Sequence, residues 1–101
     1  MKPTVIELVI FKTNSGVSET ALKEAAAKVT PILQTMNGYV RRELAVTGDG
    51  QWADIVYWTD MKAAQDAAKT AMEIPACLEF FGLIDEKSMT VLHLSVALPQ
   101  E

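Results

Sequence analysis

Four segments of the chain have the pattern of β-strands, and the segments between them have the pattern of helices. Val, Ile, Phe, Tyr and Trp are concentrated in the strand segments. Apolar residues at helical spacing, from Leu22 to Met36, predict a helix after the first strand. A second helix, rich in alanine, follows the third strand and is interrupted at Pro75. The predicted strands cover residues 4–11, 39–47, 51–59 and 89–98, and the predicted helices cover residues 18–36, 61–73 and 76–83.

Residues with strong turn and cap preferences mark the boundaries of these elements. Ser18 and Asp60 are suited to cap the N-termini of the two longer helices. Pro31 falls inside the first helix and predicts a kink one turn earlier. Gly48-Asp49-Gly50 predicts a tight hairpin between the second and third strands.

The order of elements is β-α-β-β-α-β, which predicts a ferredoxin-like α+β fold with a four-stranded antiparallel sheet and helices on one face. In this topology the strands lie in the order fourth, first, third, second. A length of 101 residues is that of one domain, predicted over residues 1–101.

The predicted strands are apolar on both faces, although one face of such a sheet can remain in water. An apolar second face this rich in aromatic residues needs a partner, and a second copy of the chain would cover it in a homodimer. We expect the helices to meet Ile6, Leu8, Ile10, Ala53, Ile55 and Tyr57, and the second copy to meet Val5, Val9, Phe11, Trp52, Val56 and Trp58.

Composition limits the classes of function. With 50% hydrophobic and 22% charged residues the chain is not of the disordered class. Its net charge of −4 argues against binding nucleic acid or a membrane surface. The single cysteine forms no internal disulfide and no zinc cluster. The N-terminal apolar run is too short for a membrane span and lacks a signal cleavage site, so we expect a cytoplasmic protein.

Three titratable residues are the candidate catalytic group. By alternation Glu7, Asp54 and His93 share the face away from the helices, on three neighbouring strands. A histidine beside a carboxylate can act as a general base, and a buried glutamate can act as an acid or base itself. The same residues would also form a polar cluster or an interface ion pair. One histidine and two carboxylates can hold a metal ion, but their spacing has no signature of a metal site. A register shift of one residue would move any of them to the other face.

Other side chains are candidates for contact with a ligand. Trp52 and Trp58 would stack on an aromatic substrate, or simply fill the core or interface. Tyr57 would donate a hydrogen bond to a phenolate or carbonyl, or pack at the rim of the sheet. Arg42 would hold a ligand carboxylate, or pair with Glu7 or Asp54 across the dimer. Cys77 has the pattern of a small buried apolar residue, with a nucleophile as the alternative.

Several segments resemble one family. The sequences VIELVIFK, NGYVRREL, QWADIVYWTD and MTVLHLSVAL, in this order and with proline-interrupted helices, are similar to the dimeric α+β barrel superfamily, especially its antibiotic-biosynthesis-monooxygenase-like domains. The resemblance covers nearly the whole chain, and its most specific part is the strand end Tyr57-Trp58-Thr59-Asp60 before a helix. It implies two sheets that pair face to face around a small apolar cavity. Members include cofactor-free monooxygenases, haem-degrading enzymes and isomerases.

The chain departs from the haem-degrading members of this family. Their second helical region carries a histidine that ligates iron, but AAQDAAKTAMEIPACLEFF contains no histidine. We therefore expect no cofactor. The resemblance implies a homodimer that binds a small apolar, aromatic molecule, as a cofactor-independent monooxygenase or isomerase with His93 as base. The alternative is a ligand-binding, sensing or structural dimer without enzymatic activity.

Overall fold

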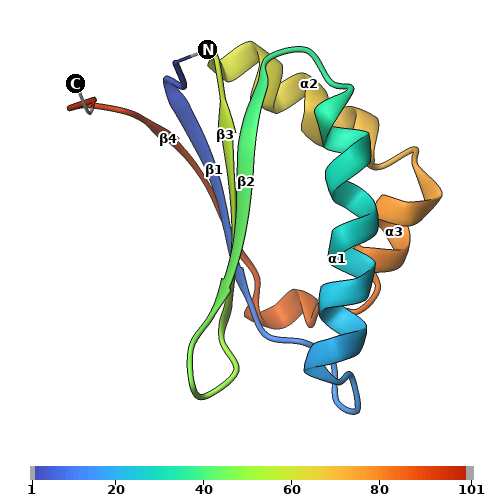
Figure 1. Cartoon of the computed structure of the whole chain (residues 1–101). Helices are drawn as coiled ribbons and strands as arrows, with labels where there is room; N and C mark the ends of the chain where they lie inside the picture. Colours follow the sequence, from blue (N-terminus) through green and yellow to red (C-terminus); the bar gives the residue numbers. More distant parts are fainter. Residues whose placement is uncertain (1, 100–101) are drawn as a thin grey trace.

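The computed structural model describes residues 2–99 and contains one four-stranded sheet with helices on one side of it (Figure 1). The ends of the expected domain, residues 1 and 100–101, lie outside the described residues. The elements, in chain order, are β1 (Val5–Phe11), α1 (Glu19–Gln34), β2 (Tyr39–Val46), β3 (Trp52–Trp58), α2 (Met61–Ala71), α3 (Pro75–Phe81), the 3₁₀ turn η1 (Glu86–Ser88) and β4 (Thr90–Ser95).

The sheet has the predicted topology. Its strand order is β2-β3-β1-β4, and all neighbouring strands are antiparallel. The two interior strands are therefore β1 and β3, and β4 is an edge strand. The ferredoxin-like fold predicted from the order of elements is confirmed, although β4 ends at Ser95 rather than at residue 98.

The predicted caps fix the helix boundaries. The side chain of Ser18 accepts a hydrogen bond from the backbone N–H of Ala21 at 3.0 Å, and that of Asp60 accepts one from Ala63 at 2.8 Å. These bonds satisfy donors that the first helical turn leaves free. Helix α1 continues through Pro31. Helix α3 begins at Pro75 itself, because proline fits the first turn of a helix, where its missing N–H costs nothing.

The face of the sheet that meets the helices is the opposite of the predicted one. Because both faces are apolar, the alternation defined two sets of residues but not which set is inside. The larger aromatic side chains lie inside because buried alanines on α2 leave them room there. The strand residues buried against the helices include Val5, Phe11, Trp52, Asp54, Val56 and Trp58, and those alternating with them on the other face include Ile6, Leu8, Ile10, Ala53, Ile55 and Tyr57.

Within residues 2–99, no helix covers the other face of the sheet (Figure 1). We call it the open face. On β4, Leu92 and Leu94 are 41% and 40% exposed and lie opposite Leu8 and Ile6 on β1. The expected apolar second face therefore exists, but other residues form it.

None of the helices within residues 2–99 has both the length and the apolar character needed to cross a membrane.

Candidate functional site

A cavity of about 280 Å³ lies between the sheet and the helices of one chain. The resemblance implied a cavity on the other side, between two sheets. The correction follows from the inverted faces, because the residues that line the cavity alternate with those of the open face. Its lining combines Glu7, Val9, Val29, Leu33, Arg42, Asp54, Val56, Trp58, Ala67, Ala68, Ala71, Met72, Cys77, Phe80, Phe81, Ile84, Glu86, Met89 and Val91.

The cavity opens beside β4, α3 and the end of α2. Met72, Phe81, Met89 and Val91 line it and are also 36–59% exposed. An entrance with exposed apolar side chains suits an apolar ligand, because binding would remove this surface from water.

Glu7 and His93 form a pair on the same side of the sheet as the cavity. They are opposite each other in the β1–β4 register, and Nε2 of His93 lies 2.8 Å from Oε2 of Glu7. The side chain of Glu7 is 18% exposed and that of His93 is 29% exposed. The predicted proximity of these two residues is confirmed, but both point toward the helix layer and not away from it.

Burial raises the pKa of Glu7 above its ordinary value of 4.5, since a carboxylate loses hydration inside the protein. The hydrogen bond and the charge of His93 oppose this rise, and the nearby charge of Asp54 adds to it.

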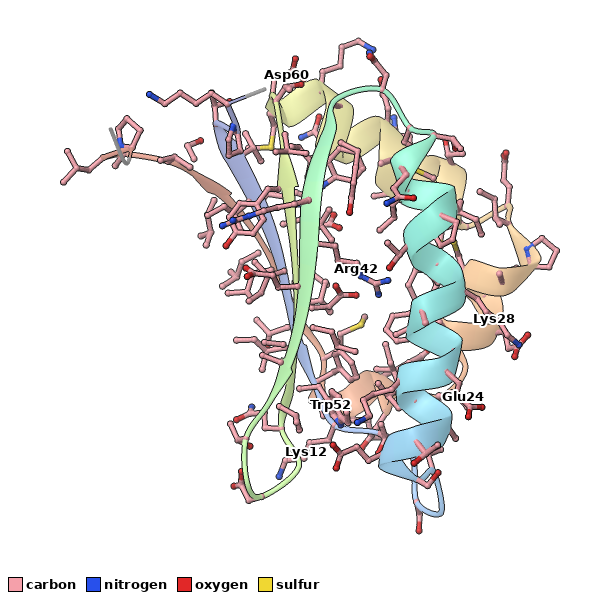
Figure 2. The ribbon with its side chains drawn as sticks, viewed as in Figure 1. Lys12, Glu24, Lys28, Arg42, Trp52 and Asp60 are labelled. Carbon is pink, nitrogen blue, oxygen red and sulfur yellow. The ribbon has the colours of Figure 1, made fainter. Side chains whose placement is uncertain are left out.

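Asp54 is paired with Arg42 and not with His93. The Nε and Nη2 atoms of Arg42 donate to the two carboxylate oxygens of Asp54 at 2.8 and 2.7 Å. Nη1 also donates to the carbonyl of Ala26 and to Oγ1 of Thr30 on α1. Figure 2 shows Arg42 pointing from the sheet toward α1. The pair predicted across a dimer therefore forms within one chain, and it joins the sheet to the helix.

Trp58 lines the cavity and is 1% exposed. Its indole Nε1–H is the one buried side-chain polar atom of the described residues that has no hydrogen-bond partner. A buried donor without a partner costs about 1–3 kcal/mol. A ligand oxygen or a water molecule would satisfy this donor.

Trp52 and Tyr57 lie outside this cavity. The indole of Trp52 stacks on Phe11, with 6.4 Å between ring centroids. Tyr57 is on the open face, where its hydroxyl donates to Glu43 at 3.1 Å and its ring lies under Arg41.

Cys77 is fully buried in the cavity wall. Burial raises the pKa of its thiol, which favours the unreactive protonated form. This environment fits the interpretation of Cys77 as a small apolar residue.

Sequence reasoning missed parts of the lining. Phe80 and Phe81 of α3 and Glu86 of η1 line the cavity but were not among the predicted site residues. The alanine-rich face of α2 was a usable signal, because small residues facing large ones leave space for a ligand.

The lining does not fit the haem of a haem-degrading enzyme. The chain has one histidine, and it is bonded to Glu7 rather than lining the cavity. Within residues 2–99 no cluster of three metal-ligating side chains is present.

Comparison with solved structures finds close similarity of fold. The chain matches an N63A mutant of SnoaB, a cofactor-independent oxygenase from Streptomyces nogalater, with a TM-score of 0.79 and 16% identity over 95% of both chains. It matches a putative antibiotic biosynthesis monooxygenase from Bordetella bronchiseptica with a TM-score of 0.78 and 14% identity, over 96% of this chain and 100% of that one.

The haem-degrading protein MhuD from Mycobacterium tuberculosis also matches, with a TM-score of 0.67 and 17% identity over 96% of this chain and 99% of that one. No protein-family model matches the sequence, and no curated protein matches it. At these identities the likeness concerns the fold. The chain therefore has the ferredoxin-like βαββαβ fold of antibiotic biosynthesis monooxygenase domains.

Proposed function

We propose that this protein binds a small apolar, aromatic molecule in the cavity between its sheet and helices, and converts it without a bound cofactor. The observation that carries the proposal is an apolar cavity lined by the carboxyl group of Glu7, which has no basic partner other than His93 among the described residues, and by the indole N–H of Trp58, which has no partner there. Cavities that bind small molecules typically combine apolar walls with a few polar groups.

The charges of the lining support a neutral ligand. Of the described residues that line the cavity, Arg42 is the only basic one, and Asp54 neutralises it at two points. Glu7 and Glu86 add negative charge. Such a site disfavours a carboxylate or phosphate on the ligand. It favours a ligand whose oxygen accepts a hydrogen bond from Trp58.

The chemistry that fits is proton abstraction followed by reaction with oxygen or by isomerisation. In the oxygenase case, O₂ converts an activated CH₂ group of the substrate into C=O and releases water. The substrate supplies all four electrons, so no external reductant is needed. In the isomerase case, the abstracted proton returns to another carbon. Both reactions begin with a base in an apolar site, and the similarity to a cofactor-independent oxygenase favours the first.

A binding or structural role without catalysis is the second candidate. Both polar pairs, Glu7 with His93 and Arg42 with Asp54, are already satisfied within the chain. Pairs of this kind also serve to fix a single arrangement of strands and helices.

The test is incubation of the purified protein with a panel of phenols and quinols that carry a benzylic CH₂ group, without added cofactor. Oxygen uptake and product mass distinguish an oxygenase from an isomerase. Trp58→Phe keeps an aromatic side chain but removes the N–H, so we expect it to lose activity. Trp52→Phe, the same change outside the cavity, should retain activity. Binding of the panel without turnover would favour the second candidate. Absence of binding would contradict the proposal.

We also propose that the open face pairs with that of a second copy. Its apolar residues lie on β1, β3 and β4, and on β2 the face carries Arg41 and Glu43, which have opposite charges. A twofold axis that passes between Arg41 and Glu43 would place each of them opposite the oppositely charged residue of the second copy. The expected location in the cytoplasm stays a prediction.

A further inference from the structure

The roles of Glu7 and His93 can be assigned from their positions. We propose that Glu7 is the residue that accepts a hydrogen bond, and then the proton, from a hydroxyl group of the ligand, and that His93 is a positioning residue behind it. This inference rests on the proposed function and reverses the order suggested by the sequence, in which His93 was the base.

Glu7, and not His93, is accessible from the cavity. Glu7 lies on the interior strand β1 and lines the cavity, whereas His93 lies on the edge strand β4 and does not line it. The side chain of His93 is also the more exposed of the two. A ligand in the cavity therefore meets the carboxyl group before the imidazole.

The hydrogen bond to His93 involves only one of the two carboxyl oxygens of Glu7. The bond to His93 occupies Oε2 of Glu7. Among residues 2–99, Oε1 has no side-chain partner, and it is not among the fully buried atoms. A carboxylate offers several acceptor positions. Glu7 thus retains a free acceptor while His93 fixes the orientation of its carboxyl group, as outer residues do for ligating or catalytic groups.

The electrostatic surroundings of Glu7 also support the assignment of His93 as the residue behind it. The charged or titratable groups around it are His93 on β4, Asp54 on β3, Arg42 on β2, Cys77 on α3 and Glu86 on η1. Asp54 is paired with Arg42, but its charge still adds to the rise of the Glu7 pKa that burial causes. Burial raises the pKa of the Cys77 thiol. His93 is the group that favours the ionised form of Glu7.

These positions define the ligand more closely. It carries a hydroxyl group as hydrogen-bond donor and no negative charge. A methyl ether of the same molecule fits the apolar walls but lacks the donor. The pair 1-naphthol and 1-methoxynaphthalene therefore separates the hydrogen bond to Glu7 from apolar burial.

The experiment is isothermal titration calorimetry of both compounds in steps of rising pH from 4.5, the ordinary pKa of the carboxyl group, because burial raises the pKa of Glu7 above this value. For the wild type we expect the naphthol to bind about ten- to a hundredfold more tightly than the ether once Glu7 is ionised, as a hydrogen bond to a charged group implies. Glu7→Gln should abolish most of this preference at every pH. Glu43→Gln on the open face is the control and should retain it.

The role of His93 is tested by His93→Gln, which keeps an N–H donor but cannot become charged. We expect the preference for naphthol to reach its full value but at higher pH, because the charge of His93 no longer lowers the pKa of Glu7. His93→Phe should weaken the preference at all pH values, since the donor is also lost. A merely structural role would leave the pH profile in place.

Four results would overturn the inference, and they are distinguishable. If His93→Gln abolishes the preference and Glu7→Gln does not, His93 is the contact residue. If His93→Gln leaves the pH profile unchanged, His93 does not act through Glu7. If the wild type binds both compounds equally, no hydroxyl contact exists and the proposed function remains. If it binds neither, the proposed function fails as well. Circular dichroism checks that each variant is folded, and Glu7→Met, which also lacks the carboxylate, replaces Glu7→Gln if needed.

Discussion

Arg42 and Asp54 form a two-point ion pair between the sheet and the helices, with side chains 5% and 11% exposed. Removing either charge would leave the other buried and unpaired, which typically costs about 3–5 kcal/mol. We therefore expect Arg42→Met and Asp54→Leu each to lower the free energy of unfolding by about this amount, measured by urea denaturation.

The double variant Arg42→Met with Asp54→Leu should be more stable than either single variant, because no unpaired charge remains. The exposed pair Lys62 and Asp66 provides a control, since Lys62→Met should cause no measurable loss. Additive losses in the double variant would contradict a coupled pair.

The raised pKa of Glu7 predicts that the free energy of unfolding depends on pH. Its pKa is raised in the folded protein above the ordinary value of 4.5, so the folded state holds this proton more tightly than the unfolded state. The resulting stabilisation is complete below the unfolded pKa and is lost as the pH rises through the folded pKa. The free energy of unfolding of the wild type, relative to that of Glu7→Gln, should therefore fall as the pH rises above 4.5, the ordinary pKa. A difference independent of pH would argue against the raised pKa.

The open face predicts the oligomeric state. Leu8 lies at the centre of this face, between Ile55 and Leu92 in the register. Leu8→Glu should convert a dimer into a monomer in native mass spectrometry, because a charge on a buried apolar interface loses its hydration. Leu78→Glu, an equivalent change at a residue of α3 that is 44% exposed, should leave the dimer intact. A monomeric wild type would rule out the proposed pairing.

The burial of Cys77 predicts that thiol reagents modify the folded protein slowly. Its side chain is fully buried and burial raises the pKa of its thiol, so little thiolate is accessible. Dithionitrobenzoate should react with the folded chain far more slowly than with the chain in urea. Equal rates would mean that the helix layer around Cys77 opens readily.

The sequence was sufficient for the fold because local signals agreed with one another. Ser18 and Asp60 mark helix starts by the hydrogen bonds that they accept, and these caps operate over three residues. The order of elements then leaves few topologies for the sheet. Which face is inside is a different kind of question, since it depends on how the helices pack. Two apolar faces carry no local information about it.

In the candidate site, too, the contacts that depend on local signals were predictable and those that depend on packing were not. Alternation and strand order brought Glu7 and His93 together, because register is a property of neighbouring strands. The partner of Asp54 depended on the position of Arg42 relative to Ala26 on α1. That position depends on how the helix packs on the sheet, which the sequence pattern does not record. The cavity itself arises from alanines of α2 that face Trp58 and Val56 on the sheet, and its volume follows from packing that no short motif records.

A substitution at Gly38 tests how closely α2 lies over the start of β2. Its backbone has φ of +85°, and a Cβ atom there would overlap the Cβ of Ala63 and lie 2.7 Å from Oγ1 of Thr59. Gly16 has a similar φ of +86° but nothing within 4 Å. A left-handed conformation costs a residue with a side chain about 1–2 kcal/mol, so Gly16→Ala should lose about this much. Gly38→Ala should lose about 1–3 kcal/mol more, because helix and sheet must separate to admit the methyl group. Urea denaturation of the two variants gives the difference, and equal losses would mean that α2 yields at this contact without cost.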